Sequence, residues 1–164
     1  ELIIHPRTRE DFYRGTPNLD MFRLGFEKSR CPVCYNGNIF TVSDYEAFCR
    51  RFPEVTSVML GRGLVAAPAL IDRILGEGKA VDKARLRAFH DRVYSEYEVM
   101  LSGEVPLLYK MKEFWNYMIC QFTNGKKYGK KIRKAQSLKK YHEIINELFE
   151  IEELIDGAGF KPND

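Results

Sequence analysis

The hydrophobic and polar positions of this chain follow one pattern in its first half and another in its second half. In the first half, short apolar runs alternate with longer amphipathic stretches, which is typical of βα units. Three of these runs are apolar on both sides, as expected of parallel strands buried on both faces: residues 2–4, 31–35 and 56–60. The pattern therefore predicts an α/β fold with three parallel strands, and it predicts helices at residues 19–27, 43–52 and 67–75.

Local signals mark where these helices begin and where the first half ends. Ser43 and Glu46 match the capping box, and Pro68 occupies a first-turn position that suits proline. The Gly-Arg-Gly sequence of residues 61–63 predicts a turn after the third strand. The Gly-Glu-Gly sequence of residues 76–78 breaks the pattern, so we expect a first domain that covers residues 1–78.

The second half is predicted to be helical throughout. Asp82 suits an N-cap position, and the apolar residues after it recur every three or four positions: Leu86, Phe89, Val93, Tyr97 and Met100. Further helices are predicted at residues 105–122, 129–135 and 138–155. The last of them has Ser137 as its cap and an apolar inner face made of Tyr141, Ile144, Ile145, Leu148 and Ile151. Short turns favour an all-α helical bundle over residues 79–156, and residues 157–164 are predicted to form a loose tail.

The composition excludes several classes of protein. The chain has 164 residues, of which 45% are hydrophobic, so it can bury a core and is not disordered. No apolar run approaches the roughly 20 residues that cross a bilayer, and no basic and then apolar leader opens the chain. Four cysteines are too few for a disulfide scaffold, which favours a cytoplasmic location. The chain opens at Glu1 directly on an apolar run, so we expect its beginning to lie inside a domain.

The net charge of +3 hides an uneven distribution. Residues 1–109 sum to zero, residues 110–140 carry ten basic side chains against the single acid Glu113, and residues 141–164 sum to −6. A local charge of +9 with aromatic side chains among the lysines is typical of a surface that neutralises phosphates. The acidic segment at residues 147–156 is interpreted as a solvated helix face and nothing more.

Polar motifs follow the predicted strands, each at the carboxyl end of its strand: His5-Pro6-Arg7, Asn36-Gly37-Asn38 and Gly61-Arg62-Gly63. The carboxyl ends of parallel strands meet at one edge, where βα barrels place active sites and phosphate sites. Glycines let backbone N–H groups approach phosphate oxygens, and arginine adds a charged bidentate donor. Each motif alone is typical of a turn. Their shared placement predicts a phosphate site.

Cys31 and Cys34 have the spacing of a redox or zinc motif. A redox pair should open a helix whose N-terminus lowers the thiol pKa, whereas this pair lies on a predicted strand. A structural zinc site needs about four ligands, and the sequence offers no second Cys-x-x-Cys and no paired His. We therefore interpret both cysteines as strand residues and predict no metal site.

Together these motifs resemble the tRNA-dihydrouridine synthases. The similarity runs from residues 4–9 (IHPRTR) through residues 32–39 (PVCYNGNI) and 58–63 (VMLGRG) to residues 109–117 (YKMKEFWNY). Members of this family are FMN-dependent (β/α)8 barrels with a C-terminal helical domain. The resemblance implies that residues 1–78 form the last three βα units of a partial TIM barrel. It also implies that the helical bundle binds tRNA.

The resemblance further implies roles for particular residues. His5 is expected to lie against the flavin ring. The FMN phosphate and its ribityl neighbourhood are expected to contact Asn36, Gly37, Asn38, Gly61 and Arg62. Arg7 and Arg9 face either the flavin or the RNA, and both possibilities stay open. The tRNA is expected to contact basic residues of the helical domain: Lys110, Lys112, Lys126, Lys127, Lys130, Lys131, Arg133 and Lys134.

The complete enzymes of this family reduce uridine in tRNA to 5,6-dihydrouridine, with FMN that is recharged by NADPH. They use a cysteine on an earlier loop as general acid and a lysine on an earlier strand, and neither segment is present in this sequence. The four cysteines occupy other places: Cys31, Cys34, Cys49 and Cys120. We therefore expect this chain to be inactive by itself, to bind FMN weakly and, because three strands cannot close a barrel, to self-associate.

Two other functions stay open on the sequence alone. One is a non-catalytic RNA-binding protein, which a true translation start just before Glu1 would favour. The other is a different FMN-dependent barrel oxidoreductase that acts on small molecules, which an absence of tRNA binding would favour.

Overall fold

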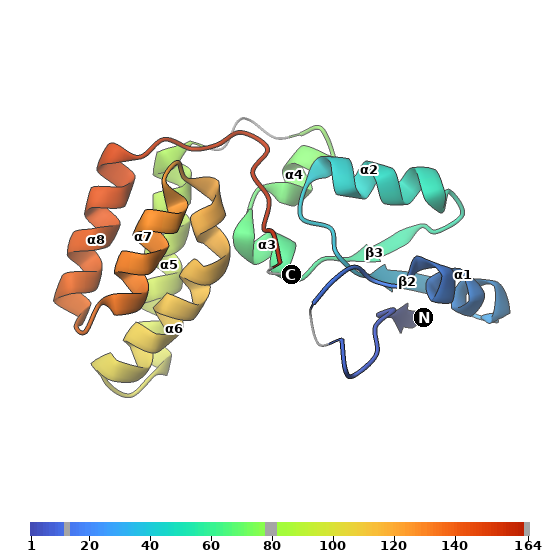
Figure 1. Ribbon diagram of the computed structural model, residues 1–164, viewed down its shortest axis with the longest axis horizontal. Helices are drawn as coiled ribbons and strands as arrows, with labels where there is room; N and C mark the ends of the chain where they lie inside the picture. Colours follow the sequence, from blue (N-terminus) through green and yellow to red (C-terminus); the bar gives the residue numbers. More distant parts are fainter. Residues whose placement is uncertain (12–13, 78–81, 163–164) are drawn as a thin grey trace.

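The computed structural model describes residues 1–11, 14–77 and 82–162, which form a sheet part and a helical part (Figure 1). In chain order, the sheet part contains β1 (Leu2–Ile4), α1 (Leu19–Lys28), β2 (Val33–Asn36), α2 (Val42–Arg51), β3 (Ser57–Met59), α3 (Arg62–Ala66) and α4 (Leu70–Ile74). The helical part contains α5 (Lys83–Met100), α6 (Glu104–Met118), the 3-10 helix η1 (Ile119–Gln121), α7 (Gly125–Lys134) and α8 (Leu138–Ile151). The predicted order of three strand and helix units followed by four helices is confirmed. The predicted boundary at Gly78 lies outside the described residues.

The three strands form a parallel sheet in which β2 lies between β1 and β3. Ile3 pairs with Cys34, and Cys34 pairs with Ser57 on the other side, so all three strands end at the same edge. β2 is buried along most of its length, whereas Leu2 and Ile3 of β1 are 44% and 52% exposed. The prediction of burial on both faces is therefore confirmed for β2. It is wrong for β1 and β3, because they form the two edges of the described sheet and keep one side at its surface.

Aromatic side chains form the core of the sheet part. Phe22 of α1 and Phe48 of α2 pack on Tyr35 of β2, with ring centroids 4.9 Å and 4.0 Å from that of Tyr35. Phe52 closes this cluster by packing edge-on against Phe22 at 5.1 Å. Because α1 and α2 meet on Tyr35, they cover the same face of the sheet.

The N-terminus of α2 is capped by a different pair from the predicted one. The Thr41 hydroxyl accepts a hydrogen bond from the Asp44 backbone N–H at 3.1 Å, and the Asp44 carboxylate accepts one from the Thr41 N–H at 2.9 Å. The predicted capping box of Ser43 and Glu46 is therefore wrong. Both candidate pairs have the required spacing, but the helix begins at Val42, which places Thr41 in the extended conformation of an N-cap.

The segment after β3 contains two short helices where the sequence predicts a turn and one helix. The predicted turn at residues 61–63 is the start of α3, whose first residue is Arg62. Pro68 disfavours helical geometry at the residue before it, so α3 ends at Ala66 and α4 starts only at Leu70. The predicted helix at residues 67–75 is therefore shorter than expected, and Pro68 precedes it.

The helical part differs from the prediction mainly in where its helices start and stop. Asp82 caps α5, as predicted, by accepting a hydrogen bond from the Arg85 N–H at 2.6 Å. α6 gives way to η1 after Met118, and α7 begins at Gly125, earlier than the predicted residue 129. The chain turns at Asn124, which has a φ of 50°, a conformation that asparagine tolerates better than most residues.

The core of the helical part surrounds Trp115 and Tyr141, both of which are fully buried. Ser137 caps α8 as predicted, through the Lys140 N–H. Two residues that the periodicity assigns to buried faces are exposed instead: Met100 is 74% exposed and Ile151 is 60% exposed. Each is the last residue of its helix, and no later turn of the same helix covers it. In the described residues no helix is long and apolar enough to span a membrane.

The segment after α8 crosses back to the sheet part and ends beside α3 (Figure 1). Leu154 forms an isolated bridge with Phe122, and Phe160 packs on Phe40 and Tyr117. The interpretation of residues 157–164 as a loose tail is therefore wrong for the part that the structure describes, which ends at residue 162.

Candidate functional site

Hydrogen bonds tie the carboxyl ends of the three strands together. The His5 ring donates from Nδ1 to the Asn36 carbonyl at 2.7 Å, and the Asn36 side chain donates from Nδ2 to the Met59 carbonyl at 3.0 Å. The predicted residues His5 and Asn36 are therefore neighbours at one edge of the sheet. Their side chains serve first to join the strand ends, because both polar groups bind backbone carbonyls.

Asn38 brings two arginines together. Its Oδ1 accepts hydrogen bonds from Arg7 Nη2 at 3.2 Å and from Arg62 Nη2 at 3.1 Å. Its Nδ2 donates to the Gly15 carbonyl at 3.3 Å, and Arg7 Nη2 donates to the same carbonyl at 2.8 Å. Two guanidinium groups thus share one neutral amide oxygen. This concentration of positive charge and N–H donors favours an anion beside it.

A buried donor of Arg7 also indicates that a hydrogen-bond acceptor binds at the carboxyl ends of the strands. Its Nε is buried and has no hydrogen-bond partner in the part of the chain that the structure describes. A buried charged donor without an acceptor costs free energy, and native proteins rarely leave one in that state. An anionic or carbonyl-rich ligand at the strand ends fits this donor set, and so does the phosphate group predicted from the sequence.

The three glycines of the site differ in the structural reason for which a glycine stands there. A Cβ at Gly37 would collide with the buried hydroxyl of Tyr35, and one at Gly63 would collide with the Ile39 carbonyl, so packing explains both glycines. Burial raises the pKa of that Tyr35 hydroxyl to about 12. A Cβ at Gly61 would meet no atom within 4 Å. Gly61 is therefore the glycine whose backbone is open to a ligand.

Two aromatic rings flank the Arg62 guanidinium. Its central carbon lies 5.4 Å from the Phe40 ring centroid and 5.9 Å from that of Phe160. Sequence reasoning missed both residues as parts of the site. Phe40 lies two residues after the Asn36-Gly37-Asn38 motif and could have been found there, but nothing local connects Phe160 with Arg62.

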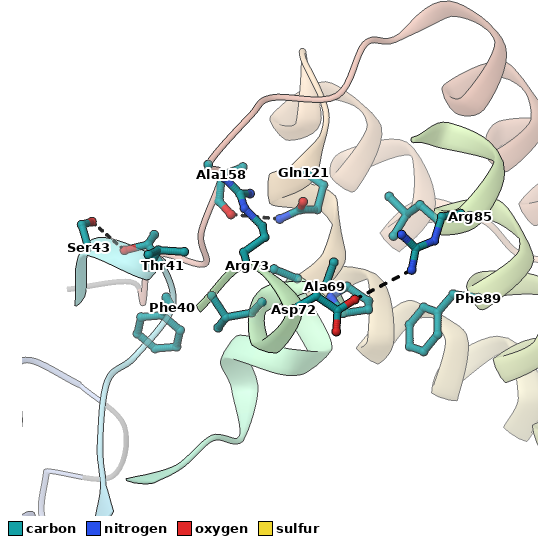
Figure 2. A pocket seen from close by; sticks show the side chains of 16 residues that line it. Phe40, Thr41, Ser43, Ala69, Asp72, Arg73, Arg85, Phe89, Gln121 and Ala158 are labelled. Atoms are coloured by element: carbon teal, nitrogen blue, oxygen red, sulfur yellow. Dashed lines mark hydrogen bonds and ion pairs between the residues drawn. The ribbon is translucent and has the colours of Figure 1, made fainter. Parts of the chain in front are cut away.

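A separate cavity of about 380 Å³ lies between the sheet part and the helical part (Figure 2). Its walls come from the start of α2, from α4 and α5, and from the segment after α8. The Asp72 and Arg85 side chains approach each other across it at 3.8 Å, and Gln121 donates to the Ala158 carbonyl at 3.1 Å. None of the six residues predicted to contact FMN lines this cavity, so it is not the predicted phosphate site.

The eight basic residues predicted to contact tRNA divide into two groups. Three are engaged inside the domain: Lys110 pairs with Glu113, Lys131 pairs with Glu147, and Lys112 donates to the Ala135 carbonyl. The other five are exposed members of α7: Lys126, Lys127, Lys130, Arg133 and Lys134. At about 100° per residue, these five lie within roughly 120° of the helix circumference. The opposite side of α7 is buried through Tyr128 and Ile132. The five cations, called the α7 basic face from here on, form one surface.

The acidic segment at residues 147–156 is not merely a solvated helix face, so the interpretation made from the sequence is wrong. Glu147 accepts hydrogen bonds from Lys131 at 2.7 Å and Tyr128 at 2.9 Å, which lower the pKa of its carboxyl group. The buried Glu152 accepts from the Thr123 hydroxyl at 2.6 Å and from Asn124. These hydrogen bonds attach α7 and the two residues before it to Glu147 and Glu152, and the α7 basic face stays exposed.

A buried hydrogen-bond network inside the helical part was also missed by sequence reasoning. Trp115 Nε1 donates to the Tyr141 hydroxyl at 2.8 Å, and the Tyr141 hydroxyl donates to His90 Nε2 at 2.7 Å. His90 Nδ1 then donates to the Asp91 carboxylate at 2.8 Å, which Arg87 also binds. Burial lowers the pKa of His90, so the ring is neutral. His90 is 1% exposed, which makes this network structural.

Comparison with known proteins identifies the family. The sequence model of the dihydrouridine synthase family matches residues 1–159, which is nearly the whole chain. The chain belongs to the dihydrouridine synthase family. The resemblance that the motifs suggested is thereby confirmed. The observed parallel sheet followed by a helical part is compatible with a partial barrel and a helical domain.

Individual relatives agree with this assignment. The chain is 40% identical over 76 residues to the tRNA-dihydrouridine(16) synthase of Ralstonia nicotianae, covering 46% of this chain and 23% of that protein. It is 33% identical over 127 residues to the enzyme of the same name from Cupriavidus necator, covering 70% of this chain and 38% of the relative. A probable tRNA-dihydrouridine synthase of Rickettsia typhi is 29% identical over 103 residues. The chain thus spans less than two fifths of the length of these relatives.

Proposed function

We propose that the protein to which this chain belongs reduces uridine in tRNA to dihydrouridine. Family membership over residues 1–159 is the observation that carries this proposal. Position 16 is the proposed target, because several relatives carry that position in their names. The same evidence favours a tRNA enzyme over a flavin oxidoreductase of small molecules and over an RNA-binding protein without catalysis.

FMN is the proposed cofactor, and its phosphate is proposed to bind at the carboxyl ends of β2 and β3. When bound, reduced FMN supplies the hydride that the uracil ring receives, and NADPH recharges the flavin. Arg62 and Arg7 provide the positive charge for the phosphate, and the open backbone at Gly61 allows close approach. His5, fixed by its bond to the Asn36 carbonyl, is proposed to face the flavin ring.

The tRNA is proposed to bind along the α7 basic face. Its exposed cations suit the phosphate backbone of a folded RNA, which proteins recognise largely through shape and charge. Lys110, Lys112 and Lys131 are proposed to add less, because each already has a partner within the domain. Arg9, which is exposed, stays a candidate for RNA contact.

The chemical step is proposed to need residues beyond this chain. Family enzymes protonate the substrate with a cysteine on an earlier barrel loop. The cysteines of this chain are poor substitutes: Cys34 is buried in the sheet, and burial raises the pKa of the Cys120 thiol. We therefore propose that this chain alone is inactive and contributes part of the cofactor site and the RNA-binding domain.

Two experiments test this function. Cells that lack the whole protein should have uridine at position 16 of their tRNAs, and mass spectrometry of those tRNAs should find dihydrouridine again after the gene is restored. Persistence of dihydrouridine at position 16 without the protein would contradict the proposed target.

The second experiment measures FMN binding to the whole protein by quenching of flavin fluorescence. Arg62→Lys keeps the charge but loses the planar fork, so we expect about tenfold weaker binding. Arg23→Lys is the matched control, because the Arg23 guanidinium also packs on a ring, that of Phe52 at 4.6 Å, but lies outside the site. Equal weakening by both variants would refute the role of Arg62.

A further inference from the structure

The segment after α8 is held in place by hydrogen bonds along its route. The Thr123 N–H donates to the Glu153 carbonyl at 2.9 Å, and the Ile155 N–H donates to the Gln121 carbonyl at 2.8 Å. Gln121 is buried, and its side chain donates to the Ala158 carbonyl at 3.1 Å. This segment, residues 152–160, is called the return strap from here on. It is attached to η1 and the residues after it at three successive points.

Two further contacts attach the return strap to the sheet part. Asp156 pairs with Arg73 of α4 at 3.0 Å. Gly159 lies so close to the backbone before α2 that a Cβ there would be 2.5 Å from Thr41 Cγ2 and 2.9 Å from the Phe40 carbonyl oxygen. A larger residue than glycine would force the strap away, so its path beside Phe40 depends on this position.

The return strap places Phe160 beside the predicted phosphate site. The Phe160 ring packs edge-on against Phe40 with centroids 5.4 Å apart, and it packs at a tilt against Tyr117 of α6 at 5.1 Å. The Arg62 guanidinium lies over both Phe40 and Phe160, at 5.4 Å and 5.9 Å. Aromatic faces attract a guanidinium and restrict its orientation. Arg62 Nη2 also donates to Asn38 Oδ1 at 3.1 Å.

We propose that Phe160 is a positioning residue for Arg62, and that the return strap is thereby part of the cofactor phosphate site. This inference rests on the proposed binding of FMN. Arginine has a long flexible side chain that loses conformational freedom when it binds a ligand. The ring of Phe160 restricts that freedom beforehand and aims the guanidinium at the strand ends. A residue near the end of the chain, beyond the helical part, therefore contributes to phosphate affinity.

The test compares FMN with riboflavin, which lacks the phosphate, on the whole protein. Phe160→Ala should weaken FMN binding about five- to tenfold, the size expected for losing a partly buried cation–π contact and its ordering effect. Riboflavin affinity should change less than about twofold, because the ring contacts of the flavin are untouched. Phe160→Tyr should restore FMN affinity. Lys161→Ala is the matched control on the same segment, since Lys161 is exposed.

The possible outcomes separate the positioning role of Phe160 from the proposed binding of FMN. Unchanged FMN affinity in Phe160→Ala, or equal weakening for FMN and riboflavin, would overturn the positioning role. If the unaltered protein binds neither flavin, the proposed cofactor is wrong. The positioning role is then decided by the Nε–Hε NMR resonance of Arg62, which should report a rigid group in the unaltered protein and a mobile one in Phe160→Ala. Equal mobility in both proteins would overturn it.

Discussion

The buried hydroxyl of Tyr141 offers a sharp test of what holds the helical part together. It accepts a hydrogen bond from Trp115 Nε1 at 2.8 Å and donates one to His90 Nε2 at 2.7 Å. Tyr141→Phe removes this single oxygen and leaves the ring packing almost unchanged. Both the indole N–H and the imidazole nitrogen then lose their partner in a site without access to solvent.

The expected cost follows from those two groups. A buried polar group that loses its partner costs about 1–3 kcal/mol, so two such groups together should lower the free energy of unfolding by about 2–6 kcal/mol. Urea unfolding of this chain measures the change, and Trp115, the one tryptophan of the sequence, reports it by fluorescence from within the network. Tyr109→Phe is the control, because Tyr109 is 68% exposed and should change stability by less than about 0.5 kcal/mol. A loss below about 0.5 kcal/mol in Tyr141→Phe would refute this reasoning.

The same network predicts a pH dependence. Burial lowers the pKa of His90 in the folded state, so between that pKa and the ordinary value near 6.5 the unfolded chain binds more protons than the folded one. Stability is therefore expected to fall as pH decreases below about 6.5. His90→Gln should flatten the pH dependence in this range. An equally steep fall in that variant would assign the dependence to other groups.

The remaining predictions concern the two candidate surfaces. The first variant replaces three members of the α7 basic face with alanine: Lys126, Lys130 and Lys134. It should bind a transcribed tRNA more weakly and reduce the slope of log K against log salt by about 2 to 3. An unchanged slope would show that α7 does not contact phosphate. Gly63→Ala should destabilise the chain by about 1–3 kcal/mol in urea, since its Cβ meets the Ile39 carbonyl. Gly61→Ala should leave stability within about 0.5 kcal/mol and yet weaken FMN binding by the whole protein; unaltered FMN affinity would move the phosphate away from Gly61.

Much of the architecture could be predicted because its signals are local. The run at residues 2–4 coincides with β1, and Asp82 and Ser137 cap the helices that the periodicity places after them. Prediction failed where two local signals competed. Thr41 with Asp44 and Ser43 with Glu46 have the same spacing, and the choice between them shows only in the folded chain, where α2 begins at Val42 and Thr41 is extended.

The candidate site was predicted in part. Asn38 and Arg62 stood out because they follow strands, and parallel strands place their carboxyl ends together whatever the details of packing. Phe160 could not be found in this way. It is separated from Arg62 by the entire helical part, and no periodicity or motif connects two residues at such a distance along the chain.

The sequence by itself determined the kinds of element, the charged segments and the family, since these depend on residue type and on spacing within a few turns of chain. Tertiary structure decided which charges remain available. Glu147 forms an ion pair with Lys131, whereas the cations of the α7 basic face stay exposed, although all of these residues belong to one basic run. It also decided that the last residues return to Arg62, because hydrogen bonds and ring packing act on distance in space and not on distance in sequence.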